Sequence, residues 1–487
     1  MSVRLNQPLA KTLNADEQAM LAQLQGNILK GHGRKLTAHV FLRFDPTQQI
    51  QSRAFLKSLS GKLTTAGLQL ANSAKFRAAK KAGNTAISTP PFMTCVLSAS
   101  GYAALGIPVA NQPSDAAFRA GMKLRASLLN DPPSPTWDVG YQNEMHAMVL
   151  IGGDANATNA SKSKQIDDAL KALQAMIPTT VTVLGVERGR AYFNGNEDGI
   201  EHFGYVDGRS QPLLRESDIE REAAGGDGII RWSPSFPLKQ VLVRDPASSD
   251  ASNFGSYFVY RKLEQNVEAF KAAEAALGQQ LQQLAAAQGH LFDPELAGAM
   301  IVGRFEDGTP VLLQNAEGMH HPVPNDFDYS GDQAGLKCPF HAHIRKTNPR
   351  GESARILASF GVTVESERAH IMARRGITYG ARKQNKKKEF LDAPTKDVGL
   401  LFMAYQSSVT NQFEFTQATW ANNPSFVNTN TGIDPVIGQG TAGSKQTHRA
   451  GWGDAQATTQ VSRFADFVTL KGGEYFFAPS LAFFAGL

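Results

Sequence analysis

One short stretch, CPFHAHIR at residues 338–345, decides which fold and chemistry this sequence indicates. It places His341 and His343 one residue apart, and the pair Arg374-Arg375 follows further along the chain. A neutral imidazole is a strong ligand for iron, copper or zinc. A guanidinium beside a metal can stabilise charge on a bound oxygen species. The combination indicates redox or Lewis-acid chemistry.

Three interpretations of His343 are open from the residues alone. The first is a buried histidine whose ring is hydrogen-bonded to the backbone. The second is a zinc site built from Cys338, His341 and His343. His320 and His321 would then supply further ligands, although Cys-x2-His-x-His is not a usual structural zinc spacing. The third is a single axial imidazole on a haem iron, with His341 as a bystander.

The composition is that of an ordinary globular protein with more than one core. The chain has 487 residues, which predicts two large domains or three. Apolar residues make up 42% and charged residues 19%, a balance that excludes a disordered chain. The net charge is +5, and its one dense basic run lies at 382–388. We interpret that run as a solvated loop, so no nucleic-acid partner is expected.

Cysteine usage and the N-terminus indicate a cellular location. Only Cys95 and Cys338 are present, so no disulfide framework supports the fold. Residues 1–8 lack the apolar core of a signal peptide. No window of the sequence approaches the ~20 apolar residues of a membrane span. We therefore expect a cytoplasmic protein with no membrane partner.

The first half of the chain has the element order of a ferredoxin-like domain. Its strand candidates are short apolar runs, and its helix candidates repeat apolar residues at helical spacing. In chain order we expect a helix at 12–30, a strand at 36–44, a helix at 50–72, strands at 91–98 and 145–152, a serine-capped helix at 161–176 and a strand at 179–186. Strand, helix, strand, strand, helix, strand is the ferredoxin-like order.

A second half of similar organisation follows after about residue 225. We expect a strand at 256–262, a helix at 264–287, a strand at 398–405, a long loop at 421–460 near the site, and a hairpin at 466–477 whose turn carries Gly472-Gly473. The expected fold class is α+β, with two ferredoxin-like domains that have antiparallel sheets and peripheral helices. The N-terminal domain would span 1–225 and the C-terminal domain 226–487.

Asp207 is the second candidate for chemistry. It lies in the stretch GYVDGRSQP at 204–212. One interpretation is a glycine-flanked turn in which the carboxylate caps the backbone. The other is a carboxylate held on a rigid turn with little bulk around it, so that a small ligand can approach.

Asp207 gains meaning from the motifs that accompany it. In chain order these are Gln25-Gly26-Asn27-Ile28-Leu29, Gly204-x-x-Asp207-Gly208, Cys338-Pro-Phe-x-Ala-His343-Ile-Arg345, Arg374-Arg375-Gly376-Ile377-x-Tyr379-Gly380, Gly399-Leu400-Leu401-Phe402, Gly432-Ile433-Asp434-Pro435-Val436-Ile437-Gly438 and Gly472-Gly473-x-Tyr475-Phe476-Phe477-x-Pro479. Together they resemble the dye-decolorizing (DyP-type) haem peroxidases over nearly the whole chain. The insertions between the motifs are similar to those of the larger fungal and cyanobacterial-like members.

The resemblance implies a role for each matching residue. His343 becomes the proximal iron ligand, and Asp434 accepts the other N–H of its imidazole. Asp207 becomes the distal acid-base residue, and Arg374, the first arginine of the Arg-Arg-Gly motif, becomes the distal arginine. The remaining roles are Leu400 and Phe402 on the distal face, Arg345 as a partner of a haem propionate, and Tyr379 and Trp420 as surface relays for electrons. His341 departs from the family pattern, because many members have a small residue there.

The same resemblance implies an activity. Haem b (iron protoporphyrin IX) would be bound in the C-terminal half of a monomer or homodimer. Hydrogen peroxide would be reduced through a ferryl intermediate, and bulky dyes, phenolic or other aromatic substrates would be oxidised. Two alternatives stay open, namely a haem-binding or storage protein without turnover and a zinc-dependent hydrolase. Asp207 and Arg374 together favour the peroxidase, because a carrier has no need of a distal acid-base pair.

Overall fold

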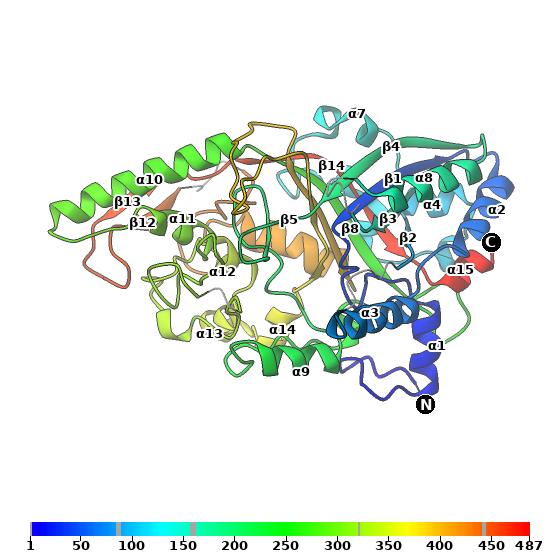
Figure 1. The fold of residues 1–487 in the computed structure, drawn as a ribbon, viewed down its shortest axis with the longest axis horizontal. Coiled ribbons are helices and arrows are strands. Elements are labelled where there is room, and N and C mark those ends of the chain that lie inside the picture. Colours follow the sequence, from blue (N-terminus) through cyan, green and yellow to red (C-terminus); the bar gives the residue numbers. More distant parts are fainter. Residues whose placement is uncertain (1, 84–88, 156–161, 320–321, 441–444) are drawn as a thin grey trace.

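The centre of the molecule is a closed ring of eight antiparallel strands (Figure 1). The computed structural model describes residues 2–83, 89–155, 162–319, 322–440 and 445–487. Around the ring the strands are β4 Val181–Arg190, β1 Leu36–Phe44, β3 Ala147–Gly153, β2 Phe92–Leu97, β14 Val468–Ala478, β8 Phe254–Gln265, β11 Gly399–Gln406 and β10 Ile377–Tyr379. Strand β8 pairs with both β14 and β11, and this closes the ring.

The ring consists of two four-stranded sheets. In the first half of the chain the order is β4-β1-β3-β2, and in the second half it is β14-β8-β11-β10. Both orders place the fourth strand beside the first, which is the ferredoxin-like arrangement. The predicted α+β fold class is therefore confirmed. The division of the chain after residue 225 stays a prediction.

The two sheets meet at two short seams. Strand β2 joins β14 through Leu97 and Phe477, and β4 joins β10 through Gly189 and Tyr379. Within each sheet the pairings are longer, such as the seven residue pairs between β1 and β3. The side chains of both sheets share one hydrophobic core. Packing inside the ring, rather than hydrogen bonding at the seams, therefore holds the two halves together.

Helices and short strands surround the ring. The first half supplies α1 Ala15–Gln23, α2 Gln49–Ser60, α3 Ala66–Lys81, α4 Ala99–Ala104, α5 Ala116–Ala120, α6 Met122–Arg125, α7 Val139–Gln142, α8 Lys164–Met176, α9 Glu216–Gly225, β5 Tyr192–Phe193 and β6 Gly199–Ile200. The second half supplies β7 Val243–Arg244, α10 Val267–Ala287, α11 Glu295–Val302, α12 His343–Thr347, α13 Glu352–Ile356, α14 Val364–Arg368, β9 Ala373–Arg374, β12 Gln446–Arg449, β13 Thr459–Ser462 and α15 Leu481–Ala485. In Figure 1, α10, α11 and the β12–β13 ribbon extend beyond one end of the ring. Within the described ranges, no helix has the length and apolar character that a membrane crossing requires.

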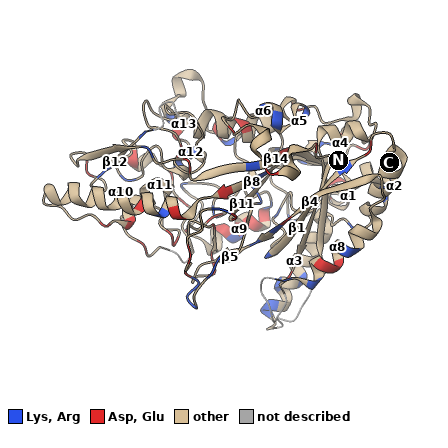
Figure 2. Cartoon of the chain, turned by 90° about the horizontal axis from the view of Figure 1, so that it is seen from above, with Lys and Arg blue, Asp and Glu red and all other residues tan. Residues whose placement is uncertain are grey.

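Charged residues of both signs are spread over the elements (Figure 2). The basic run at 382–388 lies in a loop, as expected, between β10 and β11. Arg382 is buried against Asp392, and Lys388 pairs with Glu197. Residues 382–388 contain no helix or strand longer than a single bridge residue.

Most predicted elements of the first half are confirmed, with shifted bounds. The strand at 36–44 has the predicted bounds. The helix predicted at 161–176 begins at Lys164, and Ser163 caps it by accepting from the N–H of Ile166; position 161 lies outside the described residues. The helix predicted at 50–72 is two helices, α2 and α3, because α2 ends before Gly61 and Thr65 caps a new helix.

Two predictions for the second half are wrong. The hairpin expected at 466–477 is one continuous strand, β14, whose register shifts between Leu470 and Gly472. Gly472 has a positive φ of 147°, so the glycine pair forms a bulge rather than a turn. The loop expected at 421–460 contains β12 and part of β13, which pair with each other.

Alternation along β11 places its side chains on two different surfaces. Leu401 and Met403 are buried inside the ring, whereas Leu400 and Phe402 are only half-buried on the outer face. Successive side chains of a strand point to opposite faces. The outer face of this sheet is therefore available as the wall of a site.

We expect Gly472→Ala to destabilise the protein by about 1–3 kcal/mol. A Cβ at this position would lie 2.2 Å from Cγ of Tyr141, and the backbone has a positive φ. Chemical denaturation monitored by circular dichroism measures the loss. Gly185→Ala is the matched control, because its Cβ would meet no atom within 4 Å. Equal stability of both variants would contradict the bulge.

Candidate active site

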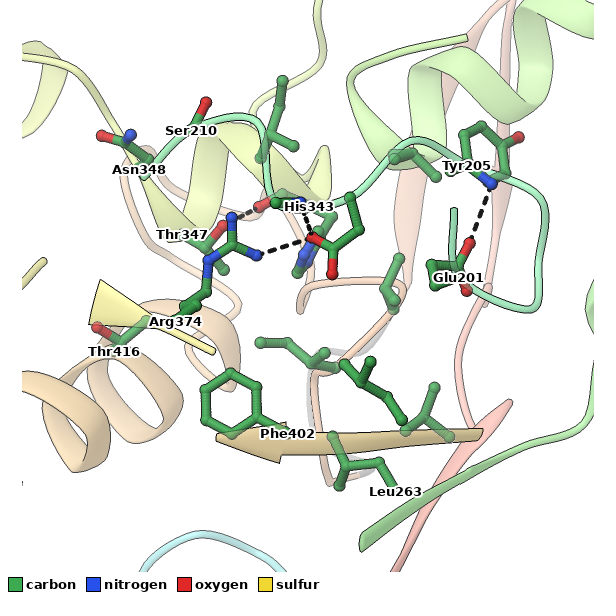
Figure 3. Close-up of a pocket in the computed structure, with 18 of the residues that line it drawn as sticks. Glu201, Tyr205, Ser210, Leu263, His343, Thr347, Asn348, Arg374, Phe402 and Thr416 are labelled. Atoms are coloured by element: carbon green, nitrogen blue, oxygen red, sulfur yellow. Dashed lines mark hydrogen bonds and ion pairs between the residues drawn. The ribbon is translucent and has the colours of Figure 1, made fainter. Parts of the chain in front are cut away.

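A large cavity lies against the outer face of β8, β11 and β14. It contains about 1740 Å³ of space free of protein atoms, including its open mouth. Its lining includes Asp207, His343 and Arg374, which come from three separate parts of the chain. The fold therefore brings together the three residues that the sequence singled out. Figure 3 shows His343 and Arg374 on one side of this space and Leu263 and Phe402 on the other.

His343 is held by a buried carboxylate. It is the first residue of α12, and its Nδ1 lies 2.8 Å from Oδ2 of Asp434. Asp434 is fully buried and also accepts from the backbone N–H groups of Val436 and Ile437. These contacts fix the imidazole ring, and Nε2 has no hydrogen-bond partner within the part of the chain that the structure describes. A histidine with one nitrogen oriented by a carboxylate and the other free is typical of a metal ligand.

The contact between His343 and Asp434 also shifts the pKa of both groups. Burial lowers the pKa of His343, but the charge and hydrogen bond of Asp434 outweigh this, and the net pKa is raised. Burial raises the pKa of Asp434, and His343 reverses the direction, so that this pKa is lowered. The carboxylate therefore stays ionised beside the imidazole.

Asp207 and Arg374 form an ion pair at the cavity wall. Nη1 of Arg374 lies 3.0 Å from Oδ1 of Asp207. The backbone N–H of Arg374 donates to Oε1 of Gln211, and the backbone N–H of Asp207 donates to the carbonyl of Gly199. Gly208, at a positive φ of 81°, donates its N–H to the carboxylate of Asp207. Both charged groups are thus attached to well-bonded backbone.

A second cavity reaches the same ion pair from another direction. Its lining also includes Asp207 and Arg374, and adds Lys30, Asp218 and Arg221 among other residues. Lys30 and Arg221 both pair with Asp218, as does Arg215. The ion pair therefore lies where the two cavities meet.

Comparison with known proteins matches this chain over its full length. Residues 23–189 match the family model of the DyP dimeric alpha+beta barrel domain. The chain is 46% identical to the multifunctional dye peroxidase DyP2 of an Amycolatopsis species, over all of both chains. It is 30% identical to the dye-decolorizing peroxidase msp1 of Mycetinis scorodonius, over 95% of this chain and 86% of that protein.

Solved structures agree with the sequence match. The structure of DyP2 from Amycolatopsis covers all of this chain with a TM-score of 0.89. The structure of a DyP-type peroxidase from Anabaena covers 97% of this chain and 98% of its own, at 38% identity and a TM-score of 0.85. The chain belongs to the dye-decolorizing (DyP-type) peroxidase family.

The side walls of the peroxidase cavity are mostly apolar. Leu400 and Phe402 of β11 line it, together with Leu263 of β8 and Leu470 of β14; their place on the distal face of a haem stays a prediction. All four lie on the outer face of the sheet, because Leu400 and Phe402 alternate with core residues of β11 and Leu263 lies directly opposite both Leu400 and Leu470 in the strand register. An apolar wall with a few placed polar groups is typical of a site for a large organic cofactor.

Arg345 does not reach this cavity, and its predicted contact with a cofactor is wrong. Its guanidinium is fully buried, donates to Glu352 and Asp332, and lies between the rings of Tyr329 and Phe340. The reason is helical geometry. Residues two apart on a helix point to opposite sides, so a ligand at the first position of α12 directs Arg345 away from the site.

Neither predicted relay residue lies on the surface. Tyr379 is 6% exposed, and the ammonium of Lys262 lies 5.1 Å from its ring centroid. Trp420 is 2% exposed and stacks on Phe426. Neither is among the residues that line the cavity. The surface position of both is therefore contradicted, while a role in electron transfer stays a prediction.

The histidine cluster gives no support to a zinc site. His341 is buried with its ring against that of His448, 4.9 Å between centroids, and it does not line the cavity. Burial raises the pKa of the Cys338 thiol to about 12. Across the described ranges, no group of three His, Cys, Asp or Glu side chains has the arrangement of a metal site. His320 and His321 lie outside the described residues.

Sequence analysis missed two cavity residues. Burial lowers the pKa of Arg304 to about 9, and its Nη2 is a buried donor without a partner among the described residues. Glu201 is a half-buried residue whose carboxyl lines the same cavity. Glu201 lies six residues before Asp207, so a polar residue close to that motif was a usable signal. For Arg304 no local signal exists.

We expect Arg345→Met to lower the free energy of unfolding by about 3–5 kcal/mol, because it removes the buried cation between two buried carboxylates and leaves Glu352 with Arg355, 3.3 Å away, and Asp332 with backbone N–H donors. Urea denaturation measures the loss. The triple variant with Glu352→Gln and Asp332→Asn should recover part of it. Cofactor content per folded molecule should equal that of the wild type, and a specific loss of cofactor at unchanged stability would restore Arg345 to the site.

Proposed function

We propose that this peroxidase holds haem b in the large cavity with His343 as the iron ligand. It would reduce hydrogen peroxide and oxidise bulky dyes, phenolic or other aromatic substrates. One observation carries the proposal. A carboxylate-oriented imidazole and an Asp–Arg ion pair, Asp207 with Arg374, line the same apolar cavity.

The residues present fit a haem in three respects. The free Nε2 of His343 suits an iron. The apolar side chains of β8, β11 and β14 suit a porphyrin face. The unpartnered Nη2 of Arg304 suits a propionate, and it replaces Arg345 as our candidate for that contact. A buried donor without a partner is costly, so a bound carboxylate would relieve it.

When bound, haem supplies the redox centre at which the O–O bond of peroxide is broken. Asp207 would take a proton from one peroxide oxygen and return it to the other. Arg374 would stabilise the negative charge that develops on the departing oxygen. Gln211 holds the backbone of Arg374, so the guanidinium is in place before peroxide arrives. Asp434 keeps the imidazole of His343 in one orientation and raises its basicity.

The finer assignments complete the proposal. Electrons from dyes too large for the cavity would pass through the protein, with Tyr379 and Trp420 as candidate relays. We place the enzyme in the cytoplasm as a monomer or homodimer, with its domains divided after residue 225. The distal ion pair supports turnover over passive storage, because a carrier needs no group that moves a proton.

Asp207→Asn should keep the haem Soret band and lose most peroxidase turnover. Asparagine is nearly isosteric but cannot accept the peroxide proton, so we expect kcat to fall by about 100-fold or more. Steady-state dye oxidation and stopped-flow mixing with peroxide measure the loss. The matched control is Asp392→Asn, whose carboxylate pairs with Arg382 outside the cavity. Unchanged turnover of Asp207→Asn would remove this residue from the mechanism.

The two neighbouring histidines should behave differently. His343→Ala should abolish or strongly weaken haem binding, because it removes the side chain whose free nitrogen faces the cavity. His341→Ala should retain haem, since His341 packs on His448 instead. Haem titration followed at the Soret band measures both. Loss of haem only in His341→Ala would reverse the ligand assignment.

A further inference from the structure

The turn that carries Asp207 is a closed hairpin. Strand β6 forms one arm, and the returning arm pairs with it through Ile200 and Val206. The N–H of Asp207 donates to the carbonyl of Gly199, 3.0 Å away. Asp207 is thus the residue at which the hairpin closes, and the shape of the hairpin head decides where its carboxylate points.

Glu201 fills the head of this hairpin. Its carboxylate accepts from the backbone N–H of Phe203 at 2.8 Å and from that of Tyr205 at 3.1 Å. The side-chain amide of Gln265, at the end of β8, donates to the same carboxylate. Figure 3 shows the carboxylate of Glu201 turned toward the N–H of Tyr205 at the edge of the cavity. Three donors therefore converge on one half-buried carboxylate.

The other side of the hairpin is fixed to α10. Phe203 stacks on Phe270 with 3.9 Å between ring centroids, and the hydroxyl of Tyr205 donates to Glu274. Gly204 has a positive φ of 103°, and a Cβ there would lie 3.2 Å from the carboxylate of Glu306. Packing on α10 therefore holds Phe203 and Tyr205, and the carboxylate of Glu201 holds the backbone between them.

We propose that Glu201 is a positioning residue for Asp207, whose carboxylate fixes the hairpin and so sets the reach of Asp207 into the cavity. This rests on the proposed role of Asp207 as the proton acceptor. The physical reason is the number of donors. The two backbone N–H groups have no other acceptor among the residues that the structure describes, so removing the carboxylate leaves them unpaired and lets the hairpin relax.

The protonation of Glu201 makes its hold on the hairpin depend on pH. Burial raises the pKa of Glu201 to about 7 against the opposing effect of its three donors, and the charge of Asp207 raises it further. The cations Arg261 and Arg374 line the same cavity, and α10 brings Lys271 and Glu274 to Tyr205. Above about pH 7 the ionised carboxylate accepts from all three donors. Below it, one oxygen carries a proton and holds the hairpin less tightly.

The test is Glu201→Gln in the haem-loaded enzyme, with stopped-flow measurement of the second-order rate constant for hydrogen peroxide from pH 5 to 9. We expect the rate constant to fall on the order of tenfold to a hundredfold, with the Soret band and thermal stability retained. In the wild type the rate constant should fall as pH drops through about 7, and the variant should lack this change. A rate constant equal to that of the wild type across this range would overturn the proposal.

Glu474→Gln is the matched control. Glu474 is a buried residue whose carboxylate, like that of Glu201, accepts from two backbone N–H groups, here of Met122 and Tyr475, and burial raises its pKa. It does not line the cavity. We expect its peroxide rate constant and pH profile to match those of the wild type. An equal fall in both variants would show a general loss of structure and would overturn the positioning role.

Two further variants separate this proposal from the proposed function. Gln265→Leu removes only the donor from β8 and should reduce the rate constant in the same direction if Glu201→Gln does not fold. In an Asp207→Asn background, Glu201→Gln should cause no further fall, because it acts through Asp207. A full further fall would refute the positioning role alone. An unaffected Asp207→Asn enzyme would instead refute the proposed function.

Discussion

Strand β8 contributes side chains of one face to the core and side chains of the other face to the cavity, and the rest of the structure depends on this double role. Its pairing with β14 on one side and β11 on the other closes the ring. Its inward side chains, such as Tyr260, belong to the core, whereas Arg261, Leu263 and Gln265 line the cavity. A strand can serve a core and a site at once because its side chains alternate. A shift of one residue in its register would exchange the two sets and destroy both.

The buried arginines around the site differ in their partners. Arg345 pairs with two carboxylates, Asp332 and Glu352, and these ion pairs stabilise the packing around α12. Among the described residues, Arg304 and Arg350 have carbonyl, hydroxyl or amide acceptors only, and burial lowers the pKa of Arg350 to about 10. A buried cation without a carboxylate is costly in a protein that has no anionic ligand. Arg345 therefore belongs to a structural ion-pair cluster, whereas Arg304 and Arg350 belong to the lining of the cavity.

Local patterns predicted the elements well, and long-range placement less well. The strand at 36–44 and the helix after Ser163 follow from side-chain periodicity and a cap, which are properties of neighbouring residues. The glycine pair at Gly472 was misread because glycine permits a bulge as readily as a turn. The meeting of Asp207, His343 and Arg374 could be expected only from family resemblance, since no local property links them. Arg345 failed for the opposite reason, because a shared motif does not fix the direction of each side chain.

The place of the Asp207–Arg374 pair between two cavities has a consequence for traffic. A molecule that enters by the cation-lined cavity meets these two side chains before it meets the imidazole of His343. The Asp207–Arg374 pair thus forms part of the boundary between the two cavities as well as supplying charged groups to the site.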